Sequence, residues 1–121
     1  MEIEINGTVY SLKFGIGLIK ELNKKYHYDK NGLSLGVGMQ QALSGVFSGD
    51  VETLIDLITL ANKTEMPRLA RAELENAIDD GELDIEKVFD DVQAAIKESN
   101  ATKFSAKKFL EQMEKEEKKQ E

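Results

Sequence analysis

One apolar stretch, residues 51–61, restricts the folds open to this chain more than any other feature. Its aliphatic side chains recur at the 3.6-residue period of a helix and cover a stripe too wide for one neighbour to bury. They are Val51, Leu54, Ile55, Leu57, Ile58 and Ala61. Asp50 and Glu52 place negative charge at the helix start, where it favours the helix dipole. The pattern predicts a central helix with other helices packed around it.

The N-terminal residues 1–13 predict a β-hairpin. Asn6 and Gly7 stand between two alternating segments, and this dipeptide accepts the two positive φ angles of a type I′ turn. A two-residue turn fixes the register, so that one face carries Met1, Ile3, Ile5, Thr8, Tyr10 and Leu12. Two strands alone are marginal in water, so this face is expected to lie on helices or on a second copy.

Helical periodicity extends through the rest of the chain. The predicted helices cover residues 14–26, 33–47, 67–79 and 85–97, with a last amphipathic segment after residue 103. Pro67 is placed to open the 67–79 helix, where its missing N–H matters least. The predicted fold is therefore mainly α, an N-terminal two-stranded hairpin followed by a bundle of five to six helices. Residues 1–103 form the hairpin and bundle of a single domain, and residues 104–121 add an amphipathic helix with a frayed, charged end.

Composition limits the classes of function. With 121 residues, the chain is expected to form one domain, and it has no Cys, which argues for a reducing compartment and against thiolate metal sites. No apolar run approaches the length of a membrane span, and the N-terminus lacks the pattern of a signal peptide. We therefore expect a cytoplasmic protein that does not contact membranes.

The net charge of −7 is unevenly distributed. Residues 50–96 carry thirteen acids against four basic residues, a net of −9, while both ends are close to neutral. This middle region repels phosphate backbones, which makes nucleic acid an unfavourable partner. The acids are interpreted as a solvated face, with attraction of a basic partner as the alternative.

No motif in the sequence predicts catalysis, a metal site or a cofactor. The Gly-x-Gly pairs at 15–17 and 36–38 lack the third Gly of a dinucleotide fingerprint, and His27 has no second imidazole to share a metal. The acidic segment 79–86 departs from a calcium loop at three positions. Asp90 and Asp91 are adjacent, so on a helix their carboxylates diverge. We expect no catalytic, metal-binding or cofactor-binding residues.

The last amphipathic segment contains the candidate partner-binding residues. These are Phe104, Phe109, Leu110 and Met113. They are either a final piece of the core or a short docking surface for another chain.

Several segments together resemble the tail assembly chaperones of long-tailed, siphovirus-type phages and prophages of Gram-positive bacteria. They are the start Glu4-Ile-Asn-Gly-Thr-Val-Tyr-Ser-Leu-Lys-Phe-Gly-Ile-Gly17, the segment Glu21-Leu-Asn-Lys-Lys-Tyr26, the segment Gly36-Val-Gly-Met39, and Glu98-Ser-Asn-Ala-Thr-Lys103 before a Lys-rich tail. The resemblance implies a non-enzymatic homo-oligomer that binds the tape measure protein and keeps it soluble while the tail tube assembles. It further implies a role in the host cytoplasm, absence from the mature virion, and a longer frameshifted product that contacts the tail tube protein.

A small phage DNA-binding transcriptional regulator is the alternative function. It would need a basic face, for which Lys13, Lys20, Lys24, Lys25 and Lys30 are the candidates.

Overall fold

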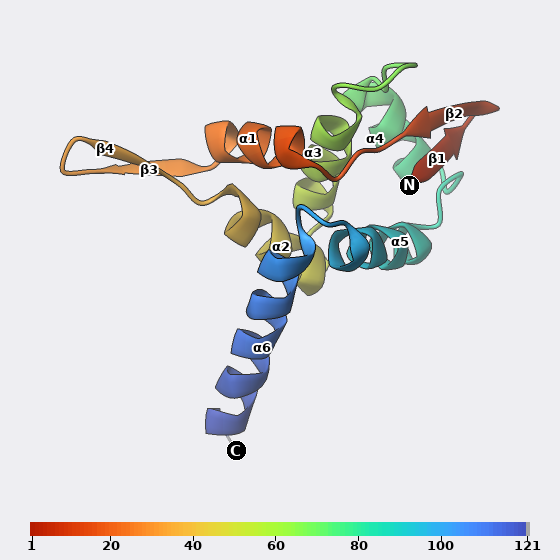
Figure 1. Cartoon of the computed structure of the whole chain (residues 1–121). Helices are drawn as coiled ribbons and strands as arrows, with labels where there is room; N and C mark the ends of the chain where they lie inside the picture. Colours follow the sequence, from red (N-terminus) through yellow and green to blue (C-terminus); the bar gives the residue numbers. More distant parts are fainter. Residues whose placement is uncertain (121) are drawn as a thin grey trace.

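The computed structural model describes residues 1–120 and contains six helices and two β-hairpins (Figure 1). Strands β1 (Glu2–Ile5) and β2 (Thr8–Ser11) form the first hairpin, and β3 (His27–Lys30) and β4 (Leu33–Gly36) form the second. The helices are α1 (Ile16–Lys25), α2 (Gly38–Ser48), α3 (Val51–Asn62), α4 (Arg71–Asp79), α5 (Ile85–Glu98) and α6 (Lys103–Gln120). The mainly α class with an N-terminal hairpin is confirmed.

The first hairpin has the predicted turn and register. Asn6 and Gly7 have φ angles of 51° and 79°, and Ile3 pairs with Tyr10. Ile3, Ile5 and Tyr10 are buried, whereas Val9 on the opposite face is 44% exposed. The Tyr10 hydroxyl donates to Glu73 of α4, and this contact joins the hairpin to the helices.

Helix α3 lies at the centre, as its wide apolar stripe predicts. Leu54, Leu57 and Ile58 are almost completely buried. The chain reverses between α2 and α3 at Gly49, whose φ of 84° requires the left-handed region. At Gly45, a Cβ would clash with the Thr53 side chain, so the two helices approach closely because this residue is glycine.

The helix predicted over residues 33–47 is wrong at its start, because a second hairpin occupies residues 27–36. Residues 33–36 form β4, and α2 begins only at Gly38. Asn31 and Gly32 have φ angles of 51° and 80°, the same turn as in the first hairpin. The apolar residues at 33 and 35 fit helical spacing as well as strand alternation, and the turn dipeptide decides for the strand.

The helix predicted to open at Pro67 is also wrong at its start, because α4 begins at Arg71. The side chain of Asn62, with 0% exposure, instead organises residues 62–69. Its amide donates to the carbonyl oxygens of Ser11 and Pro67, and its Oδ1 accepts from the backbone N–H of Leu69. These bonds hold the segment after α3 in a series of turns and bends, so that α4 starts only at Arg71.

Helix α5 begins where predicted, with the Asp84 carboxylate accepting from the backbone N–H of Glu86. Buried Thr102 then joins the last two helices, because its hydroxyl donates to the Ile96 carbonyl and its own carbonyl accepts from Ala106 N–H. Helix α6 remains regular to Gln120, where the sequence favoured fraying, and Glu121 lies outside the described residues.

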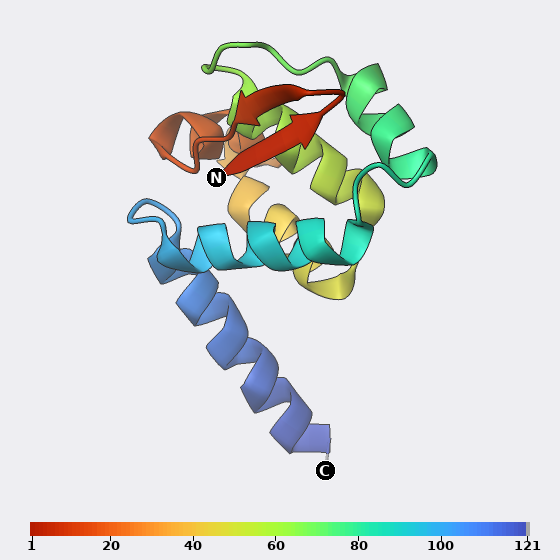
Figure 2. The same ribbon diagram turned by 90° about the vertical axis from the view of Figure 1, so that its right-hand side faces the viewer.

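Two elements project from the packed body. The β3–β4 hairpin extends away on one side (Figure 1). The C-terminal half of α6 extends in another direction (Figure 2). Within residues 1–120, no helix combines the length and apolar character needed to cross a membrane.

Candidate partner-binding surface

The two projecting elements carry most of the strongly exposed large apolar side chains. Among the described residues, five of the nine lie on the β3–β4 hairpin or on α6, namely Tyr28, Leu33, Leu35, Phe104 and Met113. Exposed apolar groups that gather on a projecting element are typical of protein-binding surfaces. The β3–β4 hairpin and α6 are therefore the candidate partner-binding surfaces.

We call residues 27–36, which form β3, the turn and β4, the arm. Every residue in it is exposed. The register pairs Tyr28 with Leu35 and Lys30 with Leu33. Since side chains alternate across a strand, these four share one face, and His27, Asp29 and Ser34 take the other. The arm is therefore amphipathic, with an apolar face that the described residues leave largely exposed at Tyr28 and Leu33.

Hydrogen bonds fix the base of the arm to the body. The backbone N–H of Val37 donates to the carbonyl of Tyr26 at 3.0 Å, and the N–H of Gly38 donates to Oδ1 of Asn23 at 2.8 Å. A Cβ at Gly38 would overlap the backbone of Leu22. The chain therefore leaves and re-enters the body through a tight junction between the end of α1 and the start of α2.

Tyr26, the residue before the arm, forms a hydrogen bond with the central helix α3. Its hydroxyl donates to Asp56 of α3 at 2.6 Å, and Arg71 of α4 donates to the same carboxylate at 2.7 Å. Burial and the adjacent Asp56 carboxylate raise the pKa of Tyr26. Burial alone would raise the pKa of Asp56, but the hydrogen bonds from Tyr26 and Arg71, together with the Lys25 charge, lower it. Three helices thus meet at one charged carboxylate beneath the arm.

The sequence-predicted site residues on α6 divide into two groups. Ala106 is fully buried, and Phe109, half-buried, packs on Phe47 with ring centroids 6.0 Å apart. Leu110 is half-buried and Met113 is 37% exposed, on the same side of the helix. The apolar stripe of α6 therefore begins in the core and continues past the edge of the body.

Phe104 is not part of that stripe. It is 67% exposed, and Lys108 Nζ lies 5.5 Å from its ring centroid. A separation of nine residues places Phe104 and Met113 on opposite sides of a helix. The structure therefore brings three of the four predicted residues together and sets the fourth apart.

A shallow groove of about 360 Å³ runs beside this stripe, between the end of α5 and α6. Its lining combines Leu110 with three lysines, Lys97, Lys103 and Lys107. Glu111 and Glu114 lie at its far end. Such a groove offers apolar contact and positive charge to an acidic, amphipathic partner segment.

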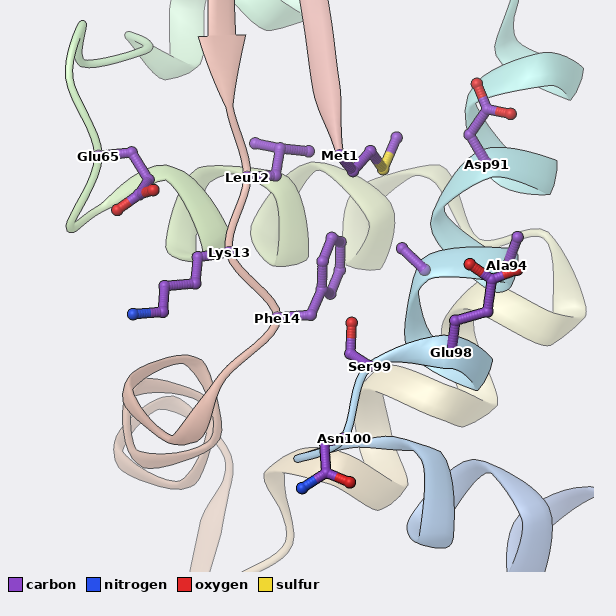
Figure 3. A pocket seen from close by; sticks show the side chains of 11 residues that line it. Met1, Leu12, Lys13, Phe14, Glu65, Asp91, Ala94, Glu98, Ser99 and Asn100 are labelled. Atoms are coloured by element: carbon purple, nitrogen blue, oxygen red, sulfur yellow. The ribbon is translucent and has the colours of Figure 1, made fainter.

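A second hollow, of about 650 Å³, lies between the chain that leaves the first hairpin and the end of α5 (Figure 3). We call it the N-terminal cleft. Leu12 and Phe14 lie beneath its floor, only 5% and 7% exposed, while Lys13 and three carboxylates stand around it. The carboxylates belong to Glu65, Asp91 and Glu98. Asp91 forms an ion pair with Lys87, with 2.8 Å between Asp91 Oδ2 and Lys87 Nζ.

Metal chemistry has no visible support in the part of the chain that the structure describes. No three His, Cys, Asp or Glu side chains gather there as a metal site would require. His27 is exposed, and its Nδ1 lies 3.0 Å from the Lys24 carbonyl oxygen.

Sequence reasoning missed the arm. The predicted helices leave Tyr28 outside any element and place Leu33 and Leu35 at the start of the helix over residues 33–47. The signal that would have identified them is the second Asn-Gly pair, at 31–32, because it repeats the dipeptide that correctly predicted the first hairpin.

Comparison with known proteins identifies the family to which the chain belongs. The model of the family described as phage tail assembly chaperone protein, TAC, matches residues 2–111. The match includes both hairpins, helices α1 to α5 and the first half of α6. No curated protein and no solved structure matches the chain significantly. With a match over most of its length, the chain belongs to the phage tail assembly chaperone family.

Proposed function

We propose that this chaperone binds the tape measure protein and keeps it soluble while the tail tube assembles around it. The observation that carries the proposal is the family match over residues 2–111. The role is non-enzymatic and belongs to the host cytoplasm, so the protein would not remain in the mature virion. Several copies would act together, and a longer frameshifted product would contact the tail tube protein.

The α6 surface is the proposed contact with the tape measure protein. Leu110 and Met113 form its exposed apolar line, with Phe109 supporting them from below and Phe104 offering a second contact on the opposite side. A long helical partner can lay its apolar face along such a line. The three lysines of the adjacent groove would select acidic residues beside that face.

Co-expression with the tape measure protein of the same phage tests this proposal. We expect the wild-type chain to keep the tape measure protein in the soluble fraction and to co-purify with it. Met113→Asp should sharply reduce the recovered complex, because it buries a charge in the contact. Gln112→Asp places the same charge at an adjacent exposed position and serves as the matched control.

Two outcomes would contradict the proposal. A tape measure protein that stays insoluble beside the wild-type chain would contradict the chaperone role for this partner. If the Met113→Asp and Gln112→Asp variants yield equal amounts of complex, Met113 on α6 is not part of the contact. The chaperone role itself would not be contradicted by that result.

A further inference from the structure

The groove between the end of α5 and α6 carries opposite charges at its two ends. Lys97, Lys103 and Lys107 lie where α5 ends and α6 begins, and Glu111 and Glu114 lie farther along α6. Helix α6 leaves the body beside the end of α5 and extends away from it (Figure 2). A partner that lies along α6 therefore meets positive charge close to the body and negative charge farther out.

Helical spacing places the α6 residues of the groove on one side of the helix. Lys107 follows Lys103 by four residues and precedes Glu114 by seven, which returns to nearly the same side at 3.6 residues per turn. Leu110 lies between Lys107 and Glu114 on that side. A rise of 1.5 Å per residue separates Lys103 from Glu114 by about 16 Å along the axis. The two charged ends can therefore contact different turns of one partner helix.

The positive charge at the lysine end is free for a partner. None of the three lysines forms an ion pair with another residue that the structure describes. Lys97 Nζ instead lies 5.7 Å from the ring centroid of Phe47, which packs on Phe109 of α6. This cation–π contact holds a lysine beside α6 without neutralising its charge.

The two ends together fit one class of partner, an amphipathic helix whose acidic and basic residues are separated along its length. Its apolar face would contact Leu110 and Met113, as in the proposed function. A helix with acidic and basic residues mixed along its length would bring like charges together at both ends of the groove. A nucleic acid would place phosphates against Glu111 and Glu114, which repel them.

We propose that the groove binds its partner helix in one direction, with the acidic end of that helix on the three lysines and its basic end on Glu111 and Glu114. An apolar line alone accepts a helix in either direction, so the charges decide between them. The inference rests on the proposed contact between α6 and the tape measure protein and adds the direction of that contact.

Two synthetic helical peptides with the same length, composition and apolar face test the charge selection. The separated peptide has its glutamates in the N-terminal half and its lysines in the C-terminal half, whereas the mixed peptide alternates them. By fluorescence anisotropy with the full chain at low salt, we expect the separated peptide to bind about tenfold more tightly. Added salt should reduce this difference, because the charges lie at an exposed surface.

A spin label tests the direction of binding. The chain has no Cys, so Lys118→Cys provides a single attachment point, one turn beyond Glu114 on the same side of α6. A nitroxide there should broaden the NMR signals of the basic end of the bound separated peptide more than those of its acidic end.

Reversal of the groove charges should reverse the bound peptide. A variant with Lys103→Glu, Lys107→Glu, Glu111→Lys and Glu114→Lys keeps the net charge, and the same label should then broaden mainly the acidic end. Lys115→Glu with Glu116→Lys exchanges charges outside the groove lining and serves as the matched control, with the wild-type direction expected. Circular dichroism should show equal helix content. If the fourfold variant loses helix, Lys107→Glu alone should still weaken binding of the separated peptide about fivefold.

Several results would overturn the inference. If the wild-type chain binds neither peptide, or binds both equally, the groove does not select a partner by its charges. Equal broadening of both ends would show that the peptide binds in both directions, and an unchanged direction in the fourfold variant would show that these charges do not set it. Recovery of the tape measure protein in the co-expression experiment is measured separately, so the proposed function can hold where this inference fails.

Discussion

Asn62 shows how much of the fold depends on single buried polar groups. Its side chain satisfies three backbone groups that belong to the end of β2 and to the segment before α4. Unsatisfied buried polar groups cost about 1–3 kcal/mol each. Asn62 therefore stabilises the conformation of the loop between α3 and α4, which the spacing of apolar residues did not predict.

We expect Asn62→Leu to lower the free energy of unfolding by roughly 3 kcal/mol, because leucine fills the space but leaves those backbone groups unpaired. Urea unfolding followed by circular dichroism would measure the change. Asn76→Leu, at an exposed position on α4, should shift stability by less than about 0.5 kcal/mol. Equal losses in the two variants would show that the Asn62 hydrogen bonds do not stabilise the fold.

Asp56 predicts a dependence of stability on pH. Its pKa is lower in the folded chain than its ordinary value of 3.8, so the charged form stabilises the fold above that value. This contribution is lost as the pH falls through the folded pKa. Asp56→Asn should therefore be less stable than wild type by roughly 1–3 kcal/mol at about pH 6 and nearly equal to it at about pH 2. An unchanged difference between those two pH values would contradict this assignment.

At the scale of elements, sequence patterns predicted best where one signal stood alone. The first hairpin and α3 followed from a turn dipeptide and from an unambiguous stripe. Residues 33–36 fitted both strand and helix periods, and the choice between them depended on Asn31 and Gly32. The start of α4 was missed because a tertiary hydrogen-bond network, invisible in local sequence, overrode the preference of Pro67 for a helix start.

Helix α6 allows a prediction that separates core from surface. Phe109→Asp should destabilise the chain by roughly 2 kcal/mol or more, because it removes the contact with Phe47 and places a charge against the core. Met113→Asp should change stability by less than about 0.5 kcal/mol, since its side chain is already partly in water. Thermal unfolding of the two variants would check the order. The reverse order would mean that α6 does not dock on the body through Phe109.

For the candidate site, the sequence predicted α6 as the relevant segment but not how its residues divide. The separation of Phe104 from Met113 follows from helix geometry alone, and the packing of Phe109 on Phe47 depends on how α2 and α6 meet. The arm escaped prediction because Leu33 and Leu35 fit helical spacing and Tyr28 lies between two predicted helices. An exposed apolar strand face looks the same in sequence as a buried one.

At the scale of the whole molecule, the charge distribution predicts no binding to duplex DNA. Lys24 pairs with Glu21, and Lys25 lies 3.7 Å from Asp56, so part of the candidate basic face is neutralised. The acidic α4–α5 region would repel phosphates nearby. An electrophoretic mobility assay at low salt should show no shifted band. A shift that weakens steeply with added salt would support the regulator alternative.

The arm and the C-terminal half of α6 leave the packed body in different directions (Figures 1 and 2). A molecule bound at one of them would leave the other open. One copy of the chain could therefore hold two neighbours at once.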